Sequence, residues 1–590
     1  MKLSGAKRFL PSWKNALLAV LSAILLIFAF PDFEYWFLAW FAFVPLLLAI
    51  EREIGHSNPP STASGSNLFP PRGLSLRSFF LGWIFGFIFF SGTCWWLTYA
   101  PIHYAAFPWP LAYFLLFCVT AVVGIFPGLF AAITSVLLRQ FGSWGFLAIP
   151  FVWVATEFAR YWITGNDWNA IGYSQAFGWS SHATRNALFA SYGGVFLTSF
   201  FVLWSPSLVM LLYMGWKAIK NPLSESGPFL MLWFSLLGIF GFASKRVRQN
   251  IKEVDAQGGV HPRLALLYVL LLFSFIVTNS CLNDAVKEPY ESGRQHTVTT
   301  VIGIQPNVPM AGLNYENWKQ LRGRQIAMAE GELSPNKEEG LSEKGQVPTT
   351  VILPESPMNY QWEEDEEFQQ FISEFAAKNN VNVLFNSAEP DAANHKYFNS
   401  AVMIDASGRE IAQYDKIYLL PFGEAVPAPL DSVLPGFVGN FSYGRNYDLV
   451  PLGDARAGIM ICFESHFGQL SREYVRRGAD AIIEMTNDGY LGPTPVLRQH
   501  LANAVFRAIE TNRPVLRVTN VGITAYINER GEVLDATKPY TEDTRVWSVA
   551  KSDGSQTFYV RYGDWFAWVC SLVTVLTLVF GVLQRRKSEN

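Results

Sequence analysis

The chain of 590 residues is too long for one compact domain, so at least two structural units are expected. Half of its residues are hydrophobic and only 16% are charged, which is less charge than soluble proteins usually carry and indicates a membrane protein. The formal net charge of −3 gives no support for nucleic-acid binding, which requires a basic surface.

Long apolar runs fill the first part of the chain, and one more lies near its end. Each approaches or exceeds the roughly 20 residues that an α-helix needs to cross a bilayer. The runs cover residues 14–31, 35–50, 79–98, 109–138, 144–162, 188–214, 264–282 and 565–584. We therefore predict three parts: a membrane domain with seven spans over residues 1–283, a water-exposed domain over 284–562, and a transmembrane helix with a short tail over 563–590.

The orientation of these parts follows from the basic residues. A short apolar segment, 229–243, lies within the insertion 217–263 and has Lys or Arg on both sides. Because basic flanks stay in the cytoplasm, we predict that this segment is re-entrant or interfacial and does not cross. Seven crossings then place the domain 284–562 on the extracytoplasmic side and the basic tail 585–587 in the cytoplasm.

Within the water-exposed domain, short β-rich runs alternate with amphipathic helical stretches, which predicts a layered α/β fold. Residues 405–408 connect two strand-like runs and favour a hairpin turn, whereas 332–346 has the composition of a surface insertion. The predicted strands are 298–304, 350–353, 381–386, 401–404, 457–461, 481–485, 515–518 and 524–527, and the predicted helices are 315–329, 366–377, 467–477 and 496–511.

Of the five cysteines, only Cys462 lies in the water-exposed domain, so this domain has no internal disulfide. The chain contains no pattern of Cys and His typical of a zinc site, and no metal or other cofactor is implied. A solitary thiol is either a small buried side chain or a nucleophile.

Three segments of this domain place a chemically reactive side chain at the end of a strand. Glu355 follows a strand that is stopped by prolines, Lys416 lies in the segment 414–424, and Cys462 ends an apolar strand. A carboxylate can take the thiol proton, an ammonium can stabilise an oxyanion, and a thiolate can attack an ester carbonyl. A helix N-terminus and a neighbouring cation are expected to lower the pKa of the thiol. Each residue alone is more often structural, but the three together form a set for acyl transfer.

In this order the three residues resemble the Glu-Lys-Cys triad of the nitrilase superfamily, and the flanking sequence is similar to its membrane-embedded branch, the apolipoprotein N-acyltransferases. The segments that carry this resemblance are 414–424, 486–488, 499–500, 506–510, 513–520 and 522–524, with Trp168, 172–175 and 562–565 in the membrane region. The resemblance implies an extracytoplasmic αββα sandwich attached to a polytopic helical membrane domain.

The resemblance also implies a function. Enzymes of this family take an acyl chain from a membrane phospholipid, commonly phosphatidylethanolamine, and transfer it to the N-terminal S-diacylglyceryl-cysteine of apolipoproteins. Cys462 would be the nucleophile, Glu355 the general base and Lys416 the oxyanion stabiliser, while Glu424 and Glu464 would support the site. The reaction would be ping-pong, through a thioester, at the bacterial inner membrane.

Candidate substrate-binding residues are mostly aromatic: Trp168, Tyr173, Tyr360, Trp362 and Phe463. The family commonly has Tyr where this chain has Phe463, and an aromatic pair where it has 489–491. We expect two loops to meet the membrane surface and gate lipid entry, the first through Met358, Tyr360 and Trp362 and the second through Phe437, Val438 and Phe441.

Two further interpretations remain open at this point. Glu157 and Arg160 lie one helical turn apart near the end of a span, which favours an ion pair, with contact to a phospholipid head group as the alternative. For the whole chain, the rival functions are a membrane-tethered nitrilase-type amidohydrolase, and a transporter or receptor with a vestigial triad. The number of spans disfavours the first, and the scarcity of intramembrane charges disfavours the second.

Overall fold

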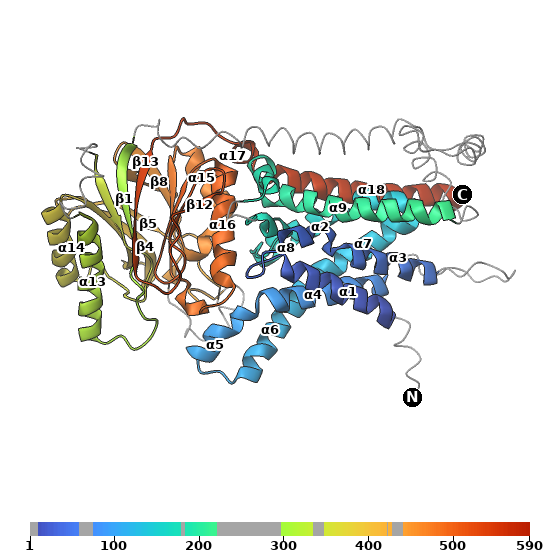
Figure 1. Cartoon of the computed structure of the whole chain (residues 1–590), viewed down its shortest axis with the longest axis horizontal. Helices are drawn as coiled ribbons and strands as arrows, with labels where there is room; N and C mark the ends of the chain where they lie inside the picture. The colour runs from blue at the N-terminus through green and yellow to red at the C-terminus, as the bar shows by residue number, and fades with distance from the viewer. Residues whose placement is uncertain are drawn as a thin grey trace.

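A helical part and an α/β part lie end to end in the computed structural model (Figure 1). The structure describes residues 10–57, 75–178, 183–220, 297–333, 347–421, 423–426 and 441–589. Several sequence predictions lie outside these residues: the segment 229–243 with most of its insertion, the span 264–282, most of the surface insertion 332–346, and Phe437 and Val438.

The helical part consists of apolar helices that run roughly along the long axis of the molecule (Figure 1). Four helical stretches, 76–93, 109–164, 185–214 and 565–583, are long and apolar enough to cross a membrane, and α1 is a shorter apolar helix. The described helices are α1 Trp13–Phe28, α2 Ala39–Ala42, α3 Val44–Ser57, α4 Leu76–Thr93, α5 Tyr99–His103, α6 Trp109–Val123, α7 Ile125–Phe141, α8 Ile149–Thr164, α9 Ala190–Lys220 and α18 Trp565–Glu589.

All predicted apolar runs except 264–282 coincide with described helices. The run 109–138 forms two helices, α6 and α7, that meet at Gly124. A side chain at this glycine would approach the backbone of α4 at Trp83 and Phe87 to 3.3 and 3.2 Å. Glycine therefore allows α4 to pack closely where the two helices join.

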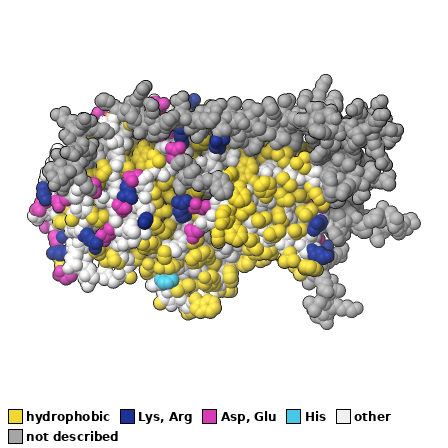
Figure 2. All heavy atoms as spheres, in the orientation of Figure 1, with side chains coloured by type: hydrophobic (Ala, Val, Ile, Leu, Met, Phe, Trp, Pro, Cys, Tyr) yellow, Lys and Arg dark blue, Asp and Glu magenta, His cyan; other side chains and the backbone are white. Residues whose placement is uncertain are grey.

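Hydrophobic side chains gather on the surface of the helical part, whereas charged side chains gather on the α/β part (Figure 2). On α18, large side chains such as Trp568, Leu572 and Phe580 are more than half exposed. An apolar surface of this extent is typical of contact with lipid.

Two stacked sheets form the centre of the α/β part, with α13 and α14 on one outer face and α15 and α16 on the other (Figure 1). This arrangement confirms the predicted αββα sandwich. The first sheet has the order β13-β1-β2-β3-β4-β5, with β6 beside β4, and the second has the order β12-β11-β10-β9-β8-β7. The helices are α13 Tyr315–Leu333, α14 Glu366–Asn379, α15 Gly468–Arg476, α16 Val496–Thr511 and α17 Phe558–Tyr562. The strands are β1 Thr297–Gln305, β2 Thr349–Ile352, β3 Asn382–Asp391, β4 Lys396–Ile404, β5 Glu410–Asp415, β6 Phe441–Ser442, β7 Leu449–Leu452, β8 Ala455–Ile461, β9 Ala481–Thr486, β10 Val515–Thr519, β11 Ala525–Ile527, β12 Val533–Leu534 and β13 Asp543–Ala550.

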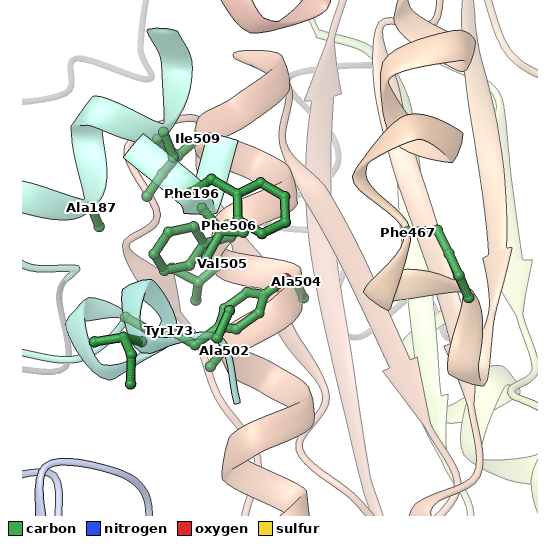
Figure 3. Packing of buried hydrophobic residues seen from close by; sticks show 14 of the residues in the cluster. Tyr173, Ala187, Phe196, Phe467, Ala502, Ala504, Val505, Phe506 and Ile509 are labelled. Atoms are coloured by element: carbon green, nitrogen blue, oxygen red, sulfur yellow. The ribbon is translucent and has the colours of Figure 1, made fainter. Parts of the chain in front are cut away.

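The two parts meet along α16, which belongs to the α/β part and packs against the helical part (Figure 3). The ring of Phe506 on α16 meets the ring of Tyr173 edge-on, with centroids 5.0 Å apart. Arg498 on the same helix donates two hydrogen bonds to Glu34, at 2.6 and 2.8 Å. The contacts on α16 thus attach the sandwich directly to the membrane helices.

Candidate active site

Glu355, Lys416 and Cys462 follow the ends of β2, β5 and β8, and so come from both sheets. The ammonium Nζ of Lys416 lies 2.8 Å from Glu424 Oε1 and 3.8 Å from Glu355 Oε1. The Cys462 thiol lies close enough to the Glu355 carboxylate for each group to shift the pKa of the other. The structure thus brings the three predicted catalytic residues and Glu424 together between the sheets.

Lys416 is a buried cation, since only 1% of its side chain is exposed. Burial acts to lower its pKa, but the carboxylates of Glu424 and Glu355 outweigh this effect and raise the pKa above its usual range. The ammonium therefore stays charged, as stabilisation of an oxyanion requires. The neighbouring carboxylate of Asp415 accepts hydrogen bonds from Ser400 and Gln413.

Glu355 is held from two sides. Its Oε1 accepts a hydrogen bond from Asn399 Nδ2 at 3.1 Å, and its Oε2 accepts one from the backbone N–H of Asn487 at 3.1 Å. Burial raises the pKa of Glu355, the ammonium of Lys416 opposes this, and Glu424 adds to it. A carboxylate whose proton affinity is increased in this way is suited to act as a base toward a thiol.

Asn399 is a residue that the sequence interpretation missed. Its amide donates to both Glu355 and Glu424, the second bond being 2.7 Å long, and thereby fixes the two carboxylates on either side of the ammonium. A single Asn within β4 offers no sequence signal for such a role.

Glu464 is a buried carboxylate that binds mainly backbone N–H groups. Its carboxylate accepts hydrogen bonds from the N–H groups of Ile461, Ile417 and Tyr418 and from the hydroxyl of Tyr414, at 2.7 to 3.0 Å. Burial raises its pKa to about 7 against these donors, which favour the ionised form. Glu464 therefore joins the end of β8, which carries the nucleophile, to the segment that follows Lys416.

Cys462 stands in a left-handed backbone conformation, with a φ of 51°. Non-glycine residues rarely adopt this conformation, and it concentrates at functional sites. The residue begins a five-residue 3-10 turn, Cys462–His466, and not an α-helix.

The expected lowering of the thiol pKa is wrong for this resting site. Burial and the Glu355 carboxylate raise the pKa of Cys462 well above its ordinary value, and Lys416 opposes them only in part. The short 3-10 turn provides little of the helix dipole on which the prediction relied. The thiol is therefore protonated at rest, and a thiolate forms only as its proton moves to a base.

Three of the aromatic candidates, Phe463, Trp168 and Tyr173, lie near this turn or at the junction of the two parts. Phe463 is buried beside His466 and Phe467, at ring distances of 4.9 and 5.3 Å. Trp168 stacks on His466 at 4.0 Å. Tyr173 is buried in the junction, where its hydroxyl donates to Asp167. Their predicted contact with substrate stays a prediction.

The expected membrane exposure of Met358, Tyr360 and Trp362 is wrong. These side chains are 3%, 4% and 9% exposed and belong to the core between the first sheet and its helices. The ring of Tyr360 stacks on Phe368 at 4.1 Å, and that of Trp362 packs on Phe385 at 5.7 Å. The two rings point inward because they pack against these two phenylalanines of the core.

Replacing Trp362 with alanine is therefore expected to destabilise the protein by about 3–5 kcal/mol, as large-to-small changes of buried aromatic residues do. Thermal unfolding of the detergent-solubilised chain measures this effect. Trp109→Ala is the control, since 69% of Trp109 is exposed. Equal unfolding temperatures for both variants would contradict the buried packing of Trp362.

The predicted ion pair between Glu157 and Arg160 is not formed directly. Glu157 accepts hydrogen bonds from Trp153 Nε1 and from the N–H of Ile171, at 3.1 and 2.8 Å. Arg160 donates to the backbone carbonyl oxygens of Trp168 and Asp167, which precede the 3-10 helix η5 (Ile171–Gln175). Both side chains thus hold the loop after α8 through hydrogen bonds to its backbone.

Comparison with known proteins relates both parts of the chain to one group. The family model described as "Carbon-nitrogen hydrolase" matches residues 347–557, and the model described as "Apolipoprotein N-acyltransferase N-terminal domain" matches residues 22–208. The chain is 27% identical to the apolipoprotein N-acyltransferase of Geobacter metallireducens over 98% of this chain and 96% of that protein. It is also 27% identical to that of Allorhizobium ampelinum, over 99% and 98% of the two chains. Among solved structures, Saccharomyces cerevisiae Nit3 is similar in fold, with 16% identity, coverage of 43% of this chain and 91% of that chain, and a TM-score of 0.32.

The αββα sandwich, its buried Glu, Lys and Cys, and the apolar helices attached to it define a membrane-embedded protein of the carbon–nitrogen hydrolase fold. Within this class, the helical part matches the N-terminal domain of apolipoprotein N-acyltransferases, and relatives of that name align along nearly the whole chain. Along nearly its whole length, the chain is similar to the apolipoprotein N-acyltransferases.

Proposed function

We propose that this chain is a bacterial membrane acyltransferase that completes lipoprotein maturation. It takes a fatty acyl chain from a membrane phospholipid, with phosphatidylethanolamine as the expected donor, and transfers it to the α-amino group of an S-diacylglyceryl-cysteine at the N-terminus of an apolipoprotein. The single observation that supports this most is the buried Lys416 between Glu355 and Glu424, beside Cys462 and next to the apolar helices.

In the first half-reaction, Glu355 takes the proton of the Cys462 thiol as the sulfur attacks the ester carbonyl of the phospholipid. The resulting oxyanion is stabilised by the ammonium of Lys416. The intermediate collapses to a thioester on Cys462, and the departing lysophospholipid oxygen takes the proton from Glu355.

In the second half-reaction, the α-amino group of the acceptor attacks the thioester carbonyl. Glu355 takes a proton from the amine, and the Cys462 sulfur leaves and recovers a proton, so that an amide is formed and the resting thiol returns. The carboxylate thus serves both half-reactions of a ping-pong mechanism.

The catalytic domain is proposed to lie on the extracytoplasmic side of the inner membrane. It stands at one end of the helices, whereas α18 ends at the opposite end (Figure 1). The last residues of α18 include Arg585, Arg586 and Lys587, and basic residues favour the cytoplasmic side. The acceptor and donor lipids would then reach the site from the outer leaflet.

The test is the intact mass of the purified chain after incubation with phosphatidylethanolamine vesicles and no acceptor. We expect the mass of one fatty acyl group to be added to the wild type and to Cys118→Ala, but not to Cys462→Ala, and to be removed by hydroxylamine. Cys118 is a suitable control because it is an exposed cysteine in α6.

A diacylglyceryl-cysteine peptide is then added to the acyl-enzyme. Release of the acyl group into the peptide as an amide supports the acyltransferase, whereas equally fast release as free fatty acid without peptide would support the amidohydrolase. A folded wild type that gains no acyl mass from phosphatidylethanolamine, phosphatidylglycerol or cardiolipin vesicles would overturn the thioester mechanism.

A further inference from the structure

Four ionisable side chains form a buried group next to the turn that carries Cys462. His500 on α16 lies with Nδ1 2.7 Å from Asp488 Oδ1 and with Nε2 3.2 Å from Glu484 Oε1. Arg517 Nη1 lies 2.5 Å from Glu484 and its Nη2 lies 2.9 Å from Asp488. At most 4% of each of these side chains is exposed.

This group is joined to the nucleophile through the backbone. The carbonyl oxygen of Cys462 lies 3.0 Å from His500 Nε2. Because Cys462 holds a left-handed conformation, its carbonyl is turned away from the direction of the preceding strand, and the imidazole provides its partner. The histidine therefore fixes the unusual turn that presents the sulfur.

The same segment reaches the proposed base. The backbone N–H of Asn487 donates to Glu355, and the side chain of the next residue, Asp488, binds His500. The Asn487 side chain is itself held by a hydrogen bond from Asn520. Residues 487 and 488 thus fix the position of the base relative to the nucleophile. His500 connects them to the cysteine.

The hydrogen-bond partners of His500 determine its protonation. Asp488 forms an ion pair with the guanidinium of Arg517, 2.9 Å away, and an ionised carboxylate can only accept hydrogen bonds. The carbonyl oxygen of Cys462 also can only accept. Each ring nitrogen of His500 thus faces an oxygen that can only accept, and this geometry fits a ring with a hydrogen on both nitrogens.

The charges around this cation balance. Asp488 and Glu484 carry two negative charges and Arg517 carries one positive charge, so a neutral His500 would leave one excess negative charge next to the thiol. Asp488 alone already acts to raise the pKa of Cys462. Facing the ring from the Cys462 turn is His466, 5.7 Å away, whose pKa is lowered far below its usual value by burial and by His500. His466 therefore stays neutral and does not supply the missing charge.

We propose that His500, as an imidazolium, is a positioning residue for the Cys462 nucleophile: it holds the Cys462 carbonyl and cancels the charge of Asp488 and Glu484, which allows a thiolate to form. The inference concerns the reactivity of the thiol, and its place in acyl transfer rests on the proposed function. It assigns a role to Asp488 and His500, which the proposed mechanism otherwise leaves unused.

The test measures the alkylation of Cys462 by iodoacetamide between pH 6 and 10 in the full-length, detergent-solubilised chain, with the Cys462 peptide quantified by mass spectrometry. His500→Gln keeps an amide donor but loses the cation. We expect its alkylation at pH 7.5 to be slower by about tenfold and its pH profile to move upward by about one unit, as expected when one nearby charge of a buried site is removed.

His466→Gln is the matched control, because it removes the neighbouring buried histidine without removing a cation. Its pH profile is expected to overlay that of the wild type. If the profile of His500→Gln also overlays that of the wild type, the proposal is wrong, even when the unfolding temperature falls. His500→Asn is measured in the same way and replaces His500→Gln if that variant does not fold.

The readout also separates this inference from the proposed function. Alkylation requires no lipid, so a shifted profile in His500→Gln supports the positioning role even if the wild type forms no acyl-enzyme. Where the acyl-enzyme does form, His500→Gln is expected to lower its rate of formation and to leave the half-saturating phosphatidylethanolamine concentration unchanged. A change in half-saturation alone would overturn the positioning role in acyl transfer.

Discussion

Replacing Lys416 with methionine is expected to slow the formation of the acyl-enzyme by at least about 10²–10³-fold, the usual cost of removing one group that stabilises an oxyanion. The ammonium is buried between Glu355 and Glu424, and only 1% of the Lys416 side chain is exposed. Methionine matches the length of the side chain, so the loss of charge is the main change.

The control for this prediction is Lys378→Met. Lys378 forms an ion pair with Glu330 at the same distance of 2.8 Å, but 70% of its side chain is exposed. Exposed ion pairs contribute at most about 1 kcal/mol, so this variant is expected to react at the rate of the wild type. A Lys416→Met variant that retained a tenth of the wild-type rate would exclude an oxyanion role for Lys416.

The pH dependence of the same reaction provides a second readout. Glu355 must be ionised to accept the thiol proton, so the rate of acyl-enzyme formation rises with pH as this carboxyl loses its proton. Burial raises the pKa of Glu355, and Lys416 acts to lower it. Removing the ammonium therefore moves the rising limb of the profile to higher pH. Stopped-time mass measurements between pH 5 and 9 follow this shift.

The sequence predicts the interior of the fold better than its edges. Buried strands such as β8 and β9 are continuous apolar runs and were predicted nearly to their bounds. Strand β13 was missed, because it is an edge strand with polar residues such as Thr544 and Arg545, and its partner β1 is far away in the sequence. Pairing between distant segments leaves no local pattern for such a strand.

In the candidate site, too, residues in a distinctive local segment could be predicted, whereas those that depend on distant contacts could not. Glu355, Lys416 and Cys462 could be predicted because each lies in a distinctive segment at a strand end. Asn399 could not, because its role depends on the two carboxylates that folding brings to it. The inward direction of the Tyr360 ring could not be predicted from the neighbouring sequence either. It depends on packing against Phe368, which only the folded chain brings close.

Replacing Arg507 with methionine is expected to destabilise the chain by about 3–5 kcal/mol and to slow acyl-enzyme formation, because it leaves a buried charge without its partner. Arg507 Nη2 lies 2.7 Å from Glu510, and only 1% of each side chain is exposed. Arg507 Nη1 also donates to the carbonyl oxygens of Ser465 and His466, at 3.0 and 3.1 Å, in the turn that begins at Cys462.

The partners of this pair lie in the helical part. Glu510 accepts a hydrogen bond from the N–H of Val195 on α9, and Arg507 donates to the hydroxyl of Tyr173. Phe506 and Ile509 lie on the same helix and pack near Phe196 and Tyr173 of the helical part (Figure 3). One side chain on α16 therefore connects the membrane helices to the nucleophile turn, and its loss should affect both stability and reactivity.

Arg498→Met is the matched control on the same helix. Arg498 also joins the two parts, through Glu34, but its side chain is 29% exposed and that of Glu34 is 25% exposed. Partly solvated pairs contribute at most about 1 kcal/mol, so thermal unfolding and the acyl-enzyme rate should change little. If both arginine variants lowered the unfolding temperature equally while leaving Cys462 equally reactive, α16 would serve only to attach the two parts. A loss of reactivity in Arg507→Met alone would mean that the membrane helices help to hold the nucleophile in its reactive geometry.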